Sequence, residues 1–195
     1  MTVRADDNLM KHVQIMSADR ILHVGMDKNF AHGTLEVKLV LPELRGARVE
    51  ASMLEGRGIV AADHLRLEAA DSGYYELSLT AGEELDSLTI DARGESNMIL
   101  TGYKTNTAKL SLSDSSVHLE GTAQTVQATV IDSSTLTGRF ASDMVDFVVR
   151  SDSEANFVAH NKITGKATER ARVAVFGDAV SNVNVSEDSS FVQGE

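Results

Sequence analysis

The chain has 195 residues, of which 42% are hydrophobic, and its formal net charge is −11. This length allows one large domain or two small ones with a real core. The acidity and the scattered Lys and Arg exclude an extended nucleic-acid interface, which needs clustered cations to displace counterions from phosphates. Cysteine is absent, which excludes disulfides, thiolate metal sites and a cysteine nucleophile.

Membrane and targeting signals are missing from the sequence. No run of about 18 apolar residues is present, so no membrane-spanning helix is predicted. A basic and then apolar signal peptide does not begin at Met1. We therefore expect either an intracellular protein or a chain whose leader lies outside this sequence.

Residues 1–43 differ in pattern from the rest, and we expect them to cap one end of the main structure. Short strands are predicted at Val3–Ala5 and Ile21–Val24. Alternating apolar and polar residues over Leu35–Leu41 predict a half-buried strand. That strand ends at Pro42, because proline has no N–H for a ladder.

A short helix is expected between the first two strands. The run 6–8 (Asp-Asp-Asn) supplies residues that favour a helix N-terminus and match its dipole. Leu9, Met10 and Val13 would then form the apolar side of one or two helical turns.

Residues 44–195 carry a repeat with a period near 20 residues. Each unit has an apolar strand, a polar corner and a second short apolar run. The strand centres are Val49, Leu67, Ile90, Leu112, Val130, Val149 and Val173. The corners are Asp71–Gly73, Gly94–Asn97, Asp114–Ser116, Asp132–Ser134, Asp152–Ser153 and Gly177–Asp178.

This repeat predicts an all-β fold, a parallel β-helix with two main sheets. One coil cannot bury its own inner face, whereas coils stacked about 4.8 Å apart can. Gly accepts positive φ at a recurring corner, and Asp and Ser bond their own backbone there. A β-sandwich is the alternative, but its strands do not share one repeating corner motif.

The predicted core is a tube of aliphatic side chains drawn from both runs of each unit. The first run supplies Leu65, Leu67, Leu88, Ile90, Leu110, Leu112, Val130, Val149, Val173 and Val175. The second run supplies Leu77, Leu79, Ile99, Val117, Leu119, Leu136, Phe157, Val180 and Val183. We expect residues near Val183–Val192, or a second copy of the chain, to cover the C-terminal end.

Three stretches of the chain share a pattern with one bacterial protein family. Val3–Leu9 (VRADDNL) and Ile21–Val24 are similar to its V-x-A-D-x-N-L segment and the strand that follows. Gly33–Leu44 is similar to its strand that ends at a proline, and the strand-and-corner series covers residues 44 to about 185. In these features the chain resembles the head GIN domain family, described as putative auto-transporter adhesins.

The resemblance implies a right-handed β-helix of two sheets with tight turns, and a non-catalytic role in the cell envelope. It also implies a protein or glycan ligand and a periplasmic or outer-surface location. Two features depart from the family pattern. Family members usually open with a leader or lipid-anchor segment and then an extra strand pair, whereas this chain starts in the middle of that pattern. Its corners are Asp-Ser rather than Gly-Ser.

Three aspartates, Asp114, Asp132 and Asp152, are candidates for a metal site, and Asp71 and Asp178 could extend this set. If they stack along one edge, their oxygens could bind a hard cation such as calcium. The simpler interpretation is that Asp begins a solvated turn, and the dense Gly- and Asp-rich nonapeptide of calcium β-rolls is absent. We therefore predict no metal and no cofactor.

Three tyrosines are weak candidates for a partner surface: Tyr74, Tyr75 and Tyr103. Successive strand residues point to opposite faces, so one of Tyr74 and Tyr75 should face outward. The outer ring could touch a glycan or a protein partner. Simple packing is the alternative interpretation for all three.

A carbohydrate-active β-helix enzyme is the alternative function, because lyases and hydrolases share this fold. Such chemistry needs a cleft with convergent Asp, Arg or Lys beside an aromatic ring. The sequence has no tryptophan, no metal-binding histidine spacing and no nucleophile elbow. We therefore predict a non-catalytic adhesin-like or scaffold protein, with a cytoplasmic assembly module as the third hypothesis. Homo-oligomers are compatible with all three.

Overall fold

The computed structural model describes residues 2–5, 10–18, 21–26, 35–80 and 84–194. The chain divides into two compact units, Met1–Pro42 and Glu43–Glu195, and each is described by itself. Among the described residues, no helix is long and apolar enough to cross a membrane. The capping role of residues 1–43 stays a prediction.

The first unit contains two antiparallel strand pairs. Strand β1 (Thr2–Ala5) pairs with β4 (Leu35–Lys38), and β2 (Val13–Ala18) pairs with β3 (Ile21–Met26). The strands predicted in this unit are therefore present, although β4 is shorter than expected.

The helix predicted in the first unit falls partly on residues 6–9, which lie outside the described residues. Its last apolar position is wrong, because Val13 begins β2 and pairs with Met26. Pairing with β3 gives the backbone groups of this segment their hydrogen bonds, which a helix would otherwise supply.

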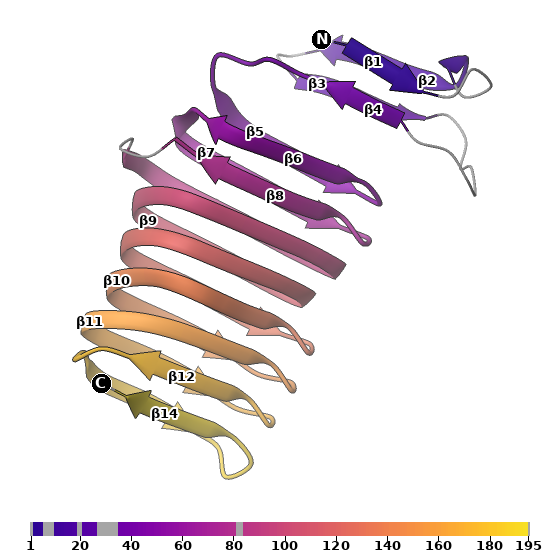
Figure 1. Ribbon diagram of the computed structural model, residues 1–195. Coiled ribbons are helices and arrows are strands. Elements are labelled where there is room, and N and C mark those ends of the chain that lie inside the picture. Colours follow the sequence, from indigo (N-terminus) through magenta and orange to yellow (C-terminus); the bar gives the residue numbers. More distant parts are fainter. Residues whose placement is uncertain (1, 6–9, 19–20, 27–34, 81–83, 195) are drawn as a thin grey trace. The chain divides into compact units, whose positions relative to one another are not determined.

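The second unit confirms the predicted parallel β-helix, as a β-solenoid of about eight turns (Figure 1). All its strand pairs are parallel. Its strands are β5 (Leu44–Glu50), β6 (Met53–Ile59), β7 (Ala61–Ala70), β8 (Tyr74–Leu79), β9 (Glu84–Ile131), β10 (Thr135–Val149), β11 (Glu154–Ala167), β12 (Arg172–Phe176), β13 (Val180–Val185) and β14 (Ser190–Gly194).

The solenoid has two faces that are joined by bends. We call the side built from β5, β7, β13 and the stretches paired with them the first face, and the side built from β6, β8, β12 and β14 the second face. Strands β9, β10 and β11 contribute to both, because their ladders continue around the bends. By hydrogen bonding, the two predicted sheets are therefore one ten-stranded sheet.

Most of the predicted core is confirmed. The ten side chains expected from the first run are all buried. Those expected from the second run are buried at Leu77, Leu79, Val117, Leu119, Leu136 and Phe157. Because coils stack in register, each of these side chains packs between equivalent positions above and below it.

Two predicted core positions are wrong. Ile99 pairs with the outward Glu76, so Met98 and Leu100 point inward instead. Val180 pairs with Lys162 on the outer surface and is 74% exposed, while Ala179 is buried. In both places apolar residues are consecutive, as Met98–Leu100 and Ala179–Val180 are, so alternation alone does not fix the register.

The C-terminal end also differs from expectation. Residues 183–192 do not fold over the solenoid, because they form part of its last coil as β13, a turn and β14. The inward Val183 and Phe191 of this coil are only partly buried. A second copy over this end stays a prediction.

Around Phe147, large and small residues alternate along the solenoid axis inside the core. Phe147 pairs with Ala128 on one side and with Gly165 on the other. A Cβ atom on Gly165 would lie 2.4 Å from the Phe147 carbonyl oxygen and 2.7 Å from its ring. The Phe147 ring stacks on Phe157 at 5.4 Å between centroids, so glycine makes room for an aromatic cluster.

Candidate functional site

A shallow groove lies on the outer surface of the first face. It has a volume of about 440 Å³ and is lined by residues of β7, β9 and β10. Its floor is the backbone of four inward-pointing residues, Ile90, Leu110, Ala128 and Phe147, whose side chains are buried in the core. The groove thus follows from strand alternation, since the residues flanking each inward position point outward.

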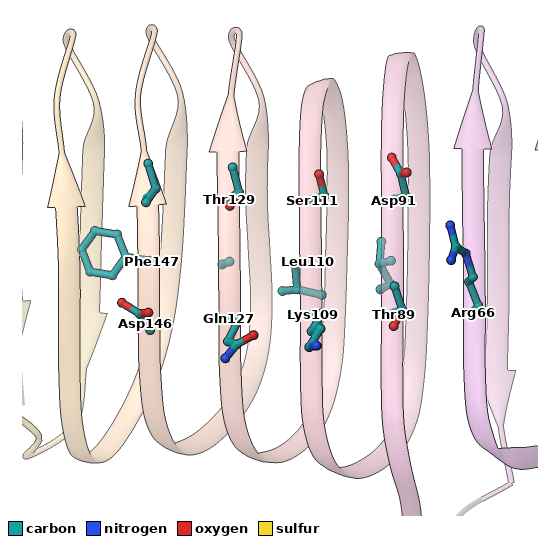
Figure 2. A pocket seen from close by; sticks show the side chains of 13 residues that line it. Arg66, Thr89, Asp91, Lys109, Leu110, Ser111, Gln127, Thr129, Asp146 and Phe147 are labelled. Carbon is teal, nitrogen blue, oxygen red and sulfur yellow. The ribbon is translucent and has the colours of Figure 1, made fainter.

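Two rows of side chains form the walls of this groove (Figure 2). We call the residues just before each inward position the first row: Thr89, Lys109, Gln127 and Asp146. We call the residues just after each inward position the second row: Asp91, Ser111, Thr129 and Val148. Gln127 pairs with Asp146, and Thr129 pairs with Val148, so both rows run across the strands along the solenoid axis.

Most of these polar groups have no partner within the described part of the chain. No side-chain hydrogen bond or ion pair involves Thr89, Lys109 or Gln127 of the first row, or Asp91, Ser111 or Thr129 of the second. At the edges of the groove, Arg66 bonds Glu68 at 2.5 Å, and Asp146 accepts a hydrogen bond from Thr164 at 3.3 Å. The central side chains therefore have free donors and acceptors.

The predicted aspartate column lies in the corners between the two faces. Asp71, Asp114, Asp132 and Asp152 all have positive φ, between 49° and 60°. Their backbone is therefore left-handed, a conformation that Asp tolerates better than most residues. Asp178 lies outside this column, because it is in the opposite bend of the coil, between β12 and β13.

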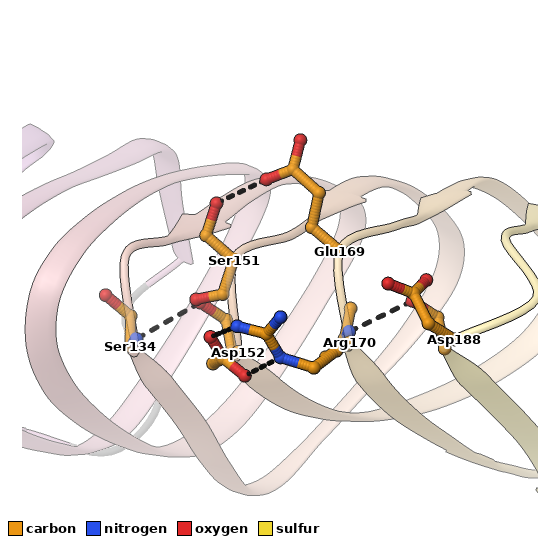
Figure 3. Close-up of polar contacts among 9 residues, drawn as sticks. Ser134, Ser151, Asp152, Glu169, Arg170 and Asp188 are labelled. Atoms are coloured by element: carbon orange, nitrogen blue, oxygen red, sulfur yellow. Dashed lines mark hydrogen bonds and ion pairs between the residues drawn. The ribbon is translucent and has the colours of Figure 1, made fainter.

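These corners are held together by hydrogen bonds from coil to coil (Figure 3). The N–H of Ser134 donates to Ser153 Oγ at 3.1 Å, and the N–H of Ser115 donates to Ser134 Oγ at 3.2 Å. The Ser134 hydroxyl donates in turn to the Ile131 carbonyl. A buried ladder of serine hydroxyls thus satisfies the backbone where the strands turn.

Three exposed carboxylates near these corners, those of Asp132, Asp152 and Glu169, are also paired. Arg170 donates to Asp152 through Nε at 2.6 Å and through Nη2, and this hydrogen bonding lowers the pKa of Asp152. Ser151 Oγ donates to Glu169 at 2.6 Å, and Ser113 Oγ donates to Asp132 at 2.9 Å. Within the described ranges, no group of three or more His, Cys, Asp or Glu residues could hold a metal ion. The hydrogen bonds of Asp132, Asp152 and Glu169 join neighbouring coils, and the absence of a bound metal stays a prediction.

The three candidate tyrosines have different surroundings. Tyr75 is buried and donates its hydroxyl to the Glu68 carbonyl at 2.8 Å. Tyr103 is buried without a hydrogen-bond partner for its hydroxyl among the described residues. Tyr74 points outward, is partly exposed and donates to Glu76 at 3.2 Å. Tyr74 is thus the one of the three whose ring is available at the surface.

The groove brings together charged groups that carbohydrate-active enzymes use, but its carboxylates are far apart. Asp91 and Asp146 lie three coils apart, which is about 14 Å along the solenoid axis alone at about 4.8 Å per coil, and they stand in different rows. Glycosidases place their two carboxyl groups about 5 to 9.5 Å apart. Asp91 and Asp146 therefore do not form such a pair.

The groove residues do not stand out in the sequence. Lys109 and Gln127 belong to strands in which only the apolar positions indicate the repeat. One signal was present, because a polar residue immediately precedes the inward residue in four successive coils. A column of that kind becomes visible only when the repeats are aligned in register.

Comparison with known proteins gives one family and two similar folds. The model of the family described as "Putative auto-transporter adhesin, head GIN domain" matches residues 1–179. None of the curated proteins compared with the chain matches it.

Two solved structures, each described as a putative adhesin, resemble this chain in fold at 17% sequence identity. One is from Parabacteroides merdae, with a TM-score of 0.77 over 99% of this chain and 82% of that one. The other is from Parabacteroides distasonis, with a TM-score of 0.80 over 98% and 82%. The family model covers most of the sequence, and the chain therefore belongs to the head GIN domain family.

Proposed function

We propose that this chain is a non-catalytic, adhesin-like protein of the cell envelope that presents the groove on its first face to a ligand. The observation that carries the proposal is the pair of rows with unpaired polar side chains. Corner side chains such as Asp152 and Ser134 bond to their neighbours, whereas Lys109, Gln127 and Ser111 have no such partners in the described residues. Free donors and acceptors on a rigid sheet are suited to binding.

The envelope location is supported by the family description as a putative auto-transporter adhesin. An adhesin acts at a cell boundary, where its ligand is a glycan or a protein on another surface. A long, stiff solenoid suits this role, because every coil repeats the same outward positions and the binding face extends with the number of coils.

A second function, carbohydrate turnover, is favoured by one specific observation. The groove gathers Arg66, Lys109, Asp91 and Asp146, the residue types that such enzymes use. Against it, Asp91 and Asp146 are separated by about 14 Å along the solenoid axis alone. The aromatic ring nearest the floor, that of Phe147, is buried and cannot stack on a sugar. Binding without turnover is therefore the better-supported function.

An attachment assay tests the proposal. Beads coated with the protein are passed over surfaces carrying glycans or matrix proteins, and beads coated with an unrelated acidic protein serve as the control. The released medium is analysed for cleaved products by mass spectrometry. We expect selective attachment without products, whereas cleavage of a bound glycan or attachment no greater than the control would overturn the proposal.

The location is tested separately in the native cells. Intact cells are labelled with a membrane-impermeant reagent, and the labelled proteins are identified after fractionation. We expect this chain among the labelled envelope proteins. Recovery only from the cytoplasmic fraction would overturn the envelope assignment and favour a cytoplasmic assembly module.

A further inference from the structure

We infer that the groove binds a neutral, linear oligosaccharide that lies along the solenoid axis across successive coils. This inference rests on the proposed binding function and adds the ligand class and the binding residues. It follows from three properties of the groove: its direction, its hydrogen-bonding groups and its charge.

The direction of the groove fits a chain-like ligand. Its two rows cross the strands, so a ligand lying between them meets an equivalent pair of side chains once in every coil. The coils are spaced by about 4.8 Å, which is close to the repeat of a linear chain of pyranose units. From the coil of Arg66 to the coil of Asp146 the groove extends about 19 Å. Roughly four linked sugars fill it.

The hydrogen-bonding groups of the groove fit hydroxyl ligands. Gln127, Ser111 and Thr129 can each donate and accept, Lys109 donates, and Asp91 accepts. Sugar hydroxyls also donate and accept, so they can satisfy all of these groups. A peptide strand that pairs with a sheet would not use these side chains, because it adds at a free sheet edge. The groove floor is interior sheet, as Phe147 pairs with both Ala128 and Gly165.

The charge of the groove favours a neutral ligand. Lys109 is its one cation without an ion pair among the described residues, and it faces a groove that also contains Asp91 and Asp146. The chain as a whole carries a net charge of −11. A polyanionic glycan would meet two carboxylates and an acidic protein, which opposes binding.

The absence of stacking predicts how the affinity depends on ligand length. The only aromatic residue lining the described groove is Phe147, and its ring points into the core. Each sugar is therefore held by hydrogen bonds alone, and a single sugar binds weakly. Affinity should rise with every added unit up to about four, and then level off once the groove is full.

Binding of a length series tests the inference. Neutral hexose and N-acetylhexosamine oligosaccharides of two to eight units, and uronic-acid chains of equal length, are titrated against the full chain. The variants are Gln127→Ala and Lys109→Ala. Their controls are Gln124→Ala, an exposed glutamine of the same coil outside the groove, and Lys162→Ala, an exposed lysine two coils beyond Gln127. Circular dichroism checks that every variant folds.

The expected result is binding that strengthens up to about four neutral units and weakens about five- to tenfold in each groove variant but in neither control. If neutral oligosaccharides bind the groove variants as tightly as the unchanged protein, the proposed site is wrong. If uronic-acid chains bind more tightly than neutral chains, the proposed ligand class is wrong. If no oligosaccharide binds while coated beads still attach to protein surfaces, this inference fails and the proposed function stands. Failure of both assays removes both.

Discussion

The two buried tyrosines should respond in opposite directions to loss of their hydroxyl groups. Tyr75 Oη donates to the Glu68 carbonyl at 2.8 Å, whereas Tyr103 Oη is buried and has no partner in the described residues. Both rings lie in the same core, with exposures of 0% and 3%. Replacing each by phenylalanine keeps the ring and removes only the oxygen, which isolates the hydrogen bond.

The magnitudes follow from the cost of burying polar groups. Tyr75→Phe removes one made hydrogen bond, so we expect it to lower the free energy of unfolding by about 1 kcal/mol. Tyr103→Phe removes a hydroxyl that loses its water on folding and gains nothing in return, so we expect a gain of about 1 kcal/mol or more. The two variants should therefore differ by about 2 kcal/mol.

Urea unfolding followed by circular dichroism measures this difference, with Tyr74→Phe as the surface control. The m-values should stay constant, so that shifts of the midpoint report stability. The expected order of midpoints is Tyr103→Phe, then the unchanged protein with Tyr74→Phe beside it, then Tyr75→Phe. If Tyr103→Phe is destabilised as much as Tyr75→Phe, the Tyr103 hydroxyl has a partner and the reasoning is wrong.

Three further predictions concern the core, the corners and the pH dependence. Gly165→Ala should lower the free energy of unfolding by about 1 to 3 kcal/mol, because the new Cβ meets Phe147. Gly25→Ala is the control, because the space around Gly25 is open and the substitution should change stability little. Similar shifts of the melting temperature in both variants would contradict the packing. Ser134→Ala should lower the free energy of unfolding by about 1 to 3 kcal/mol, because it leaves buried backbone groups unpaired. Ser133→Ala, at the exposed neighbouring position, is the control in urea titrations. Equal unfolding midpoints of the two variants would count against the serine ladder. Burial raises the pKa of Tyr75 and of Tyr103 above the ordinary value of 10.0, so the unfolded chain loses these protons at lower pH than the folded chain. The free energy of unfolding should therefore keep its full contribution from these groups below about pH 10 and fall above it. Unfolding midpoints that stay equal from pH 9 to pH 11 would contradict this.

The repeating architecture could be predicted because corner and core signals recur together. Asp114, Asp132 and Asp152 mark left-handed corners, and aliphatic residues such as Leu112 and Val130 follow the inward positions. Each signal alone is weak, but their fixed order leaves one arrangement that buries every aliphatic column. The same regularity explains the error at Ile99, where three consecutive apolar residues fit either register.

The groove could not be predicted in the same way. Whether Lys109 lies beside Thr89 and Gln127 depends on coil lengths, and these differ. Phe147 pairs with Gly165, 18 residues on, whereas Leu67 pairs with Ile90, 23 residues on. The serine ladder was missed for a related reason. Ser134 and Ser133 look alike in the sequence, and only the backbone conformation of the corner points one of them inward.

The register of neighbouring coils is the basis of both the fold and the groove, and a cysteine pair tests it directly. The chain has no cysteine, so a pair placed at Gln127 and Asp146 is the only one present. These residues are Cα partners in adjacent parallel coils, a separation that a disulfide can bridge. We predict that mild oxidation of the monomer consumes both thiols of this pair, whereas a pair at Gln127 and Arg139, on opposite faces, stays reduced. A reduced first pair, or an oxidised second pair, would contradict the account.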